Sequence, residues 1–189
     1  DYRRLLAISY QNDGDYRALI GDTNGALDSF RKKLALDEQS MAADPANAQA
    51  RADFGYSCER LAELLITIDA NSQAVTYGRK ALSVWEQLLE HAPDSQALRS
   101  RMIKAHASLA QAYQRAGRAL DARKATDRAA ELTQEERNLG RALVLVQSAQ
   151  QRMAAGETAA ALAQLKEATE LSPQLALGHL QLGRAFRTA

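Results

Sequence analysis

The chain has 189 residues, of which 46% are hydrophobic, and its 24 basic and 23 acidic side chains nearly cancel. This composition is typical of a folded domain and excludes a disordered, low-complexity chain. The single cysteine excludes an intramolecular disulfide and a cysteine-built zinc site, and it favours a reducing compartment such as the cytoplasm. No apolar run exceeds five residues, so neither a membrane span nor a signal-peptide core is predicted.

Helix-forming residues dominate the sequence, and strand-forming residues are sparse, which predicts an all-α protein. Prolines at Pro45 and Pro93 stop one helix and open the next, while Gly117 and Gly156 provide tight turns. Residues 15–21 are predicted to be an inserted loop, either folded onto the first hairpin or binding a partner. The apolar periodicity predicts nine helices, at residues 2–12, 24–43, 47–68, 73–91, 95–116, 119–133, 138–154, 158–171 and 174–187.

An internal repeat links the first two thirds of the chain. Pro45 and Pro93 are 48 residues apart, and the segment 21–68 shares ten identities with the segment that follows it at this shift. Because these identities recur at helical spacing, chance is a poor explanation, and the chain is predicted to be built from repeated helical units. The identical positions are Ala26, Arg31, Lys32, Leu34, Glu38, Gln39, Pro45, Arg51, Leu61 and Ala62, each matched 48 residues later.

Several segments resemble tetratricopeptide repeats. The second-helix pattern of that family is closest in Ala161, Leu165, Ala168 and Pro173. The first-helix pattern occurs as Leu6, Ala7, Tyr10, Gly14 and again as Leu109, Ala110, Tyr113, Gly117. The resemblance implies an α-α superhelix, a solenoid of about four helical hairpins plus a closing helix. The stretch GALDSFRKKL to AADPANAQAR also resembles regions attached to bacterial serine/threonine protein kinases, which implies a regulatory or recruiting part of a signalling protein.

The period of 48 residues exceeds the 34 of the family by 14, and each helix of a hairpin is predicted to be seven residues longer. Adding about two turns to both helices preserves their antiparallel registry. Residues 1–134 are therefore predicted to form the extended hairpins, and residues 135–189 a shorter hairpin and closing helix continuous with them. Five extra residues, 135–139, precede the helix at 138–154. Because the sequence begins with Asp1 rather than Met, we expect it to be part of a longer polypeptide.

The resemblance places a binding surface on the concave face lined by the first helices of each hairpin. A peptide or helix is the expected ligand, and Glu59 and Glu63 disfavour the terminal carboxylate that chaperone-binding members of the family clamp. The positions that correspond to the family's ligand-facing residues are Tyr56, Glu59, Glu63, Ile66, Lys104, Gln111, Gln114 and Arg115.

The charge distribution leaves alternatives open. Residues 1–70 carry a net charge of −4, from 8 basic and 12 acidic side chains, while residues 99–128 carry +6, from 8 basic and 2 acidic. This pattern indicates a solvated surface, an acidic peptide partner or self-association, and nucleic acid is disfavoured because aromatic residues are not interleaved with the basic ones. Leu175, Leu177, Leu180 and Leu182 are expected to be exposed on the last helix and to favour dimers.

Catalytic or metal chemistry is not predicted. The three histidines have no cysteine or carboxylate companions at a metal-binding spacing, and no phosphate-binding glycine loop follows a strand. Cys58 lies on the packing face of its helix, where a buried, inert thiol is expected. We therefore expect a protein that is not an enzyme and that binds no cofactor and no metal.

Overall fold

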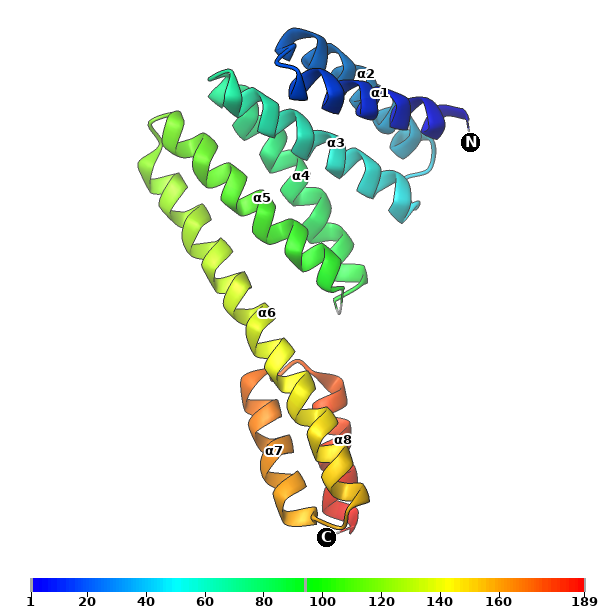
Figure 1. Cartoon of the computed structure of the whole chain (residues 1–189), viewed down its shortest axis with the longest axis vertical. Coiled ribbons are helices and arrows are strands. Elements are labelled where there is room, and N and C mark those ends of the chain that lie inside the picture. Colours follow the sequence, from blue (N-terminus) through cyan, green and yellow to red (C-terminus); the bar gives the residue numbers. More distant parts are fainter. Residues whose placement is uncertain (1, 94, 189) are drawn as a thin grey trace. The chain divides into compact units, whose positions relative to one another are not determined.

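The structure is a computed structural model that describes residues 2–93 and 95–188 (Figure 1). Within that part of the chain every regular element is helical, which confirms the prediction of an all-α protein of stacked helical hairpins. Two compact units divide the chain at Ala130 and Glu131, and each is described by itself. The helices are α1 (Tyr2–Leu19), α2 (Thr23–Ala43), α3 (Ala48–Thr67), α4 (Asn71–His91), α5 (Gln96–Arg115), α6 (Ala119–Ala154), α7 (Thr158–Leu171) and α8 (Ala176–Thr188).

In the first unit the hairpins follow one another in chain order. Helix α1 packs against α2, α2 against α3, α3 against α4, and α4 against α5, while α3 also contacts α5 across the hairpin boundary. The core of this unit includes Phe30 of α2, Leu61 and Leu65 of α3, and Leu109 of α5, all at most 3% exposed. Serial stacking of this kind buries each helix mainly against its neighbours in the chain.

The hairpin turns repeat the 48-residue period in the backbone itself. Gly21, Asp69 and Gly117 are spaced by 48 residues and have φ angles of 81°, 57° and 72°, in the left-handed region. The residue after each one donates its N–H to a carbonyl five positions earlier, for example Asp22 to Arg17 at 2.8 Å. This is the Schellman arrangement, which ends a helix and reverses the chain.

Helix starts carry the same period. Asn47 and Ser95 lie two residues after the two prolines and cap α3 and α5, because their side-chain oxygens accept hydrogen bonds from backbone N–H groups of the first turn. Asp22 caps α2 in the same way, with its carboxylate 3.0 Å from the N–H of Gly25. Local capping chemistry therefore sets these helix boundaries.

The predicted loop at residues 15–21 is wrong, because α1 continues to Leu19. Gly14 is not a turn residue but a buried helical glycine, and a Cβ placed on it would lie 2.6 Å from Cε1 of Phe30. Its role is to let α1 approach α2 closely. The turn glycine of the first hairpin is Gly21, so the first helix of this hairpin is lengthened as in the two hairpins that follow.

Replacing Gly14 by alanine is expected to lower the free energy of unfolding by about 1 kcal/mol or more, although alanine is the better helix former. The Phe30 ring is buried and has no free space in which to retreat from the added methyl group. Gly140→Ala in α6 is the matched control, since a Cβ there meets no atom within 4 Å. It should stabilise by up to about 1 kcal/mol. Urea unfolding followed by circular dichroism measures both, and equal signs for the two variants would contradict this account.

The separate helices predicted at 119–133 and 138–154 are also wrong, since α6 is one helix of 36 residues. The segment between them contains Glu135, Glu136 and Arg137, which are good helix formers, and no proline or left-handed glycine stops it. The division into compact units falls after Ala130, whereas the sequence prediction placed the boundary after Gln134.

The second unit has a small core of its own, made by the last part of α6 together with α7 and α8. Its residues include Val146, Leu165 and Leu175. The expectation that Leu175 and Leu182 are exposed is wrong, because Leu175 is buried and Leu182 packs against this core. Leu177 and Leu180 are exposed as expected.

A buried polar cluster lies between α2 and α3. Nζ of Lys33 donates to Oδ2 of Asp37 at 2.5 Å and to Oγ of Ser57 at 2.7 Å, and Ser57 donates to Asp37. All three side chains are at most 4% exposed. The positions 48 residues later are Ala81, Trp85 and Ala105, so the next repeat fills the equivalent place with apolar side chains.

Candidate functional site

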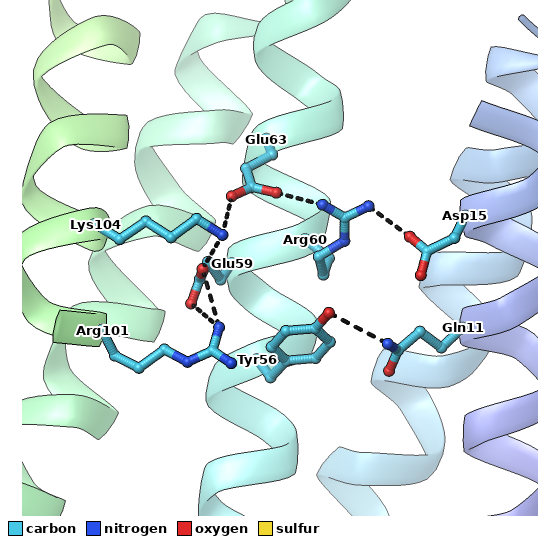
Figure 2. A network of polar contacts seen from close by, with 8 residues as sticks. All are labelled: Gln11, Asp15, Tyr56, Glu59, Arg60, Glu63, Arg101 and Lys104. Carbon is cyan, nitrogen blue, oxygen red and sulfur yellow. Dashed lines mark hydrogen bonds and ion pairs between the residues drawn. The ribbon is translucent and has the colours of Figure 1, made fainter. Parts of the chain in front are cut away.

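Four of the predicted binding residues meet on the face formed by α1, α3 and α5. Tyr56, Glu59 and Glu63 lie on successive turns of α3, and Lys104 reaches them from α5 (Figure 2). Residues on one face of a helix recur every three to four positions, which is the spacing of this α3 series. We call this set of contacts, together with Gln11, Asp15, Arg60 and Arg101, the first-helix network.

Glu59 is the centre of the network and is only 2% exposed. Its carboxylate lies 2.7 Å from Nζ of Lys104 and 3.3 Å from Nη1 of Arg101, both on α5. A carboxylate this deeply buried needs such compensation, because removal from water costs several kcal/mol when no partner is present, on the order of the idealised penalties for buried ions. The α3–α5 contact is therefore held by charge as well as by apolar packing.

The network extends from Glu63 to the first hairpin. Glu63 accepts from Nζ of Lys104 at 2.8 Å and from Nη1 of Arg60 at 2.6 Å. Arg60 also pairs with Asp15 of α1 through its other terminal nitrogen. Three consecutive first helices are thus connected through one chain of ion pairs.

The Lys104 ammonium stays charged within this arrangement. Its partial burial alone would lower its pKa, but hydrogen bonds to Glu59 and Glu63 and the charge of both carboxylates outweigh that effect and raise the pKa above its ordinary value. The same balance raises the pKa of Arg60, where burial is opposed by Asp15 and Glu63. The network is a stable set of fixed charges at neutral pH rather than a titrating site.

Tyr56 connects the network to an aromatic cleft. Its hydroxyl accepts a hydrogen bond from Nε2 of Gln11 at 3.2 Å, and the Arg101 guanidinium lies 4.9 Å from its ring centre. Arg101 also lies 5.9 Å from the ring of Trp85, which comes from α4 beneath. Contacts of a cation with aromatic faces stabilise this geometry and fix the guanidinium.

The cleft itself lies between α3 and α5 and has a volume of about 250 Å³. Tyr56, Trp85 and Arg101 line it, with Ala97 and Leu98 of α5 on the opposite wall. The indole Nε1 of Trp85 is buried and has no hydrogen-bond partner among the described residues. Clefts with an apolar floor and a few fixed polar groups are the usual form of small binding sites.

The remaining predicted residues do not join the network. Ile66 is buried at 4% exposure, and its carbonyl oxygen accepts from Nη1 of Arg115 at 2.9 Å. Arg115 also pairs with Asp69 at the turn after α3. Gln111 and Gln114 are exposed on α5. Ile66 is thus a core residue, and Arg115 contacts the C-terminal end of α3.

Sequence reasoning missed Arg101, Arg60 and Trp85 as parts of this face. A signal for Arg101 was present, because it lies three residues before Lys104 and so shares its side of α5. Trp85 was interpreted only as packing of the added turns. Its place below the cleft depends on the way α4 lies under α3 and α5.

Other groups with chemical potential are inactive in this structure. Burial raises the pKa of the Cys58 thiol to about 12, so it is not a thiolate at neutral pH. Residues 2–93 and 95–188 contain no cluster of three histidine, cysteine or acidic side chains arranged for a metal ion. In the same ranges, no helix combines the length and the hydrophobicity that crossing a membrane requires.

The fold and this face define the class of the protein only as a stack of helical hairpins with a polar network and a cleft on one side. Comparison of the sequence with models of known protein families finds no match, and comparison with curated proteins finds no similar sequence.

Proposed function

We propose that this chain is a non-catalytic protein-interaction module of the tetratricopeptide type, which binds a peptide or a helix on its first-helix face. The cleft lined by Tyr56, Trp85 and Arg101 is the observation that carries the proposal. It combines an aromatic floor with a fixed guanidinium, and aromatic residues and arginine dominate the energetics of protein recognition.

The rigidity of the surface supports this proposal. The first-helix network fixes α1, α3 and α5 before any partner arrives, so a ligand does not have to order its host. Binding to such a preorganised surface loses less conformational entropy than binding to a flexible one. The network also satisfies Glu59 and Glu63 internally, which leaves the aromatic cleft as the part of this face most suited to a ligand.

The assignment to the tetratricopeptide type rests on the hairpin architecture, the turns spaced by 48 residues and the sequence resemblance. With the resemblance to kinase-linked regions and the reduced, buried Cys58, it supports a cytoplasmic module of a bacterial signalling protein. In that setting the module would recruit a protein to a catalytic partner rather than act on it.

The chain provides its own probe for this proposal, because Trp85 is its only tryptophan and lines the cleft. Peptides enriched from a random displayed library against the whole chain should change Trp85 fluorescence on titration. Ala97→Phe fills the cleft and should weaken their binding about tenfold or more, which corresponds to 1.4 kcal/mol or more. Ala163→Phe on exposed α7 is the matched control and should bind as the wild type does.

Three results would count against a peptide-binding cleft. The library could yield no enriched peptide, the enriched peptides could bind without altering Trp85 emission, or Ala97→Phe could bind them unchanged. Light scattering over a range of concentrations separates the alternative of a self-associating scaffold, since a module that binds peptides in the cleft should not need a second copy to do so.

A further inference from the structure

A second groove lies on a different side of the first unit, along the exposed surface of α4. It has a volume of about 500 Å³ and runs from the start of α4 to the turn between α5 and α6. Ser72, Thr76 and Ser83 contribute hydroxyl groups, and Arg79 and Lys80 lie between them on the same helix. This groove shares no lining residue with the cleft at Trp85.

The groove is positively charged and contains no carboxylate among its described lining residues. Within residues 2–93 and 95–188, neither Arg79 nor Lys80 has an ion-pair partner, and both are exposed. Arg118 forms the end of the groove, held by Asp121 at 2.7 Å and stacked at 4.6 Å from the ring centre of Tyr113. Two free cations and one fixed cation therefore face the same space.

The repeat offers an internal comparison for this groove. Arg79 and Lys80 correspond to Arg31 and Lys32 of α2, which are the identical residues 48 positions earlier. Lys32 is neutralised by Asp28, whose carboxylate lies 2.6 Å from its Nζ. The position equivalent to Asp28 is Thr76, so the second repeat keeps both cations and lacks the internal anion.

The other wall of the groove differs in the same direction. Arg118 corresponds to Ala70 of the preceding repeat, which carries no charge. The α4 groove thus gains a cation at its end and loses an acid at its side relative to the equivalent surface of α2. A cationic surface without an internal counter-ion is suited to an anionic ligand.

We propose that this groove binds an acidic segment of a partner polypeptide, with its carboxylates against Arg79 and Lys80. The hydroxyl-bearing residues run from Ser72 to Ser83, a helical length of about 16 Å, which an extended peptide covers with about five residues. Hydroxyl groups on the same wall can donate hydrogen bonds to carboxylates or to peptide carbonyl groups. Nucleic acid is disfavoured, because the described lining of the groove has no aromatic ring on which a base could stack.

The test measures fluorescence anisotropy of a fluorescein-labelled hexaglutamate peptide titrated with the whole chain. Thr76→Asp restores the acid of the first repeat beside Lys80 and should weaken binding about tenfold. The double variant Arg79→Gln/Lys80→Gln should weaken it at least as much. Its matched control, Arg31→Gln/Lys32→Gln, removes the same charge from α2 and should bind as the wild type does. All the substituted side chains are exposed, and circular dichroism checks the fold.

Each further outcome has a defined meaning. Equal losses in the α4 and α2 double variants would show general attraction by the net charge and overturn the proposal, as would an unchanged Thr76→Asp variant. A single-stranded oligonucleotide that binds more tightly than hexaglutamate, and loses affinity in the α4 variant, would assign the groove to nucleic acid instead. Ala97→Phe should leave hexaglutamate binding unchanged, which separates this groove from the proposed peptide cleft.

Discussion

Replacing Lys33 by methionine is expected to lower the free energy of unfolding of the first unit by about 3–5 kcal/mol. Lys33 is 4% exposed and is the cation that compensates Asp37, which is equally buried. Methionine keeps much of the side-chain volume but leaves the carboxylate with only the Ser57 hydroxyl as a donor. Urea or thermal unfolding followed by circular dichroism measures the loss.

The matched control replaces the whole cluster with apolar side chains, as Lys33→Met/Asp37→Leu/Ser57→Ala. Buried ion pairs exchanged for well-packed apolar groups are often neutral or stabilising. The chain itself supports this expectation, because Ala81, Trp85 and Ala105 occupy the equivalent positions 48 residues later. The triple variant should therefore recover most of the loss. A single variant as stable as the wild type would show that the cluster does not hold a buried charge.

The period of the hairpins could be predicted from the sequence because its signals are local. Pro45 and Pro93 stop helices through the backbone of the residue before them, and Asn47 and Ser95 cap the next helices through their own side chains. None of these effects depends on distant contacts. The lengthening of both helices in a hairpin then follows from the distance between equivalent residues.

Gly14 shows why other boundaries could not be predicted in the same way. Glycine serves both as a left-handed turn residue and as a place where two helices approach closely, and one sequence does not distinguish these roles. Only the proximity of Phe30 reveals that Gly14 has the second role. The spacing of Gly21, Asp69 and Gly117 was a usable signal for the true turn, but Asp69 concealed it because a non-glycine residue rarely occupies such a position.

Helix α6 failed for the opposite reason. The break predicted between 133 and 138 came from the expected repeat length of the family, while the local sequence contains good helix formers throughout. No proline, capping residue or left-handed glycine ends the helix before Ala154. Local propensity decides the outcome here, and the expected family period does not.

The candidate site was predicted in its positions but not in its state. The resemblance placed Tyr56, Glu59, Glu63 and Lys104 on one face, and the structure brings these residues together. The burial of Glu59 was not predictable, because it arises from side chains of α5 that reach across from the next hairpin. Long, flexible cations make such contacts only after the hairpins have stacked.

Removing both cations from Glu59 is expected to have the other large effect. The double variant Arg101→Met/Lys104→Met leaves a carboxylate of 2% exposure without its compensating charges, and should lower the free energy of unfolding by about 3 kcal/mol or more. Each single variant should cost much less, because the second cation still contacts Glu59. The two substitutions should therefore be strongly non-additive in a double-mutant cycle measured by urea unfolding.

Two comparisons isolate the buried charge as the cause. Glu59→Gln added to the double variant removes the uncompensated carboxylate and should restore much of the lost stability. Arg115→Met also breaks an interhairpin ion pair, but its partner Asp69 is 79% exposed, so the ion-pair loss should be below about 1 kcal/mol. Strict additivity of the Arg101 and Lys104 effects, or no recovery with Glu59→Gln, would mean that burial of Glu59 is not what couples α3 to α5.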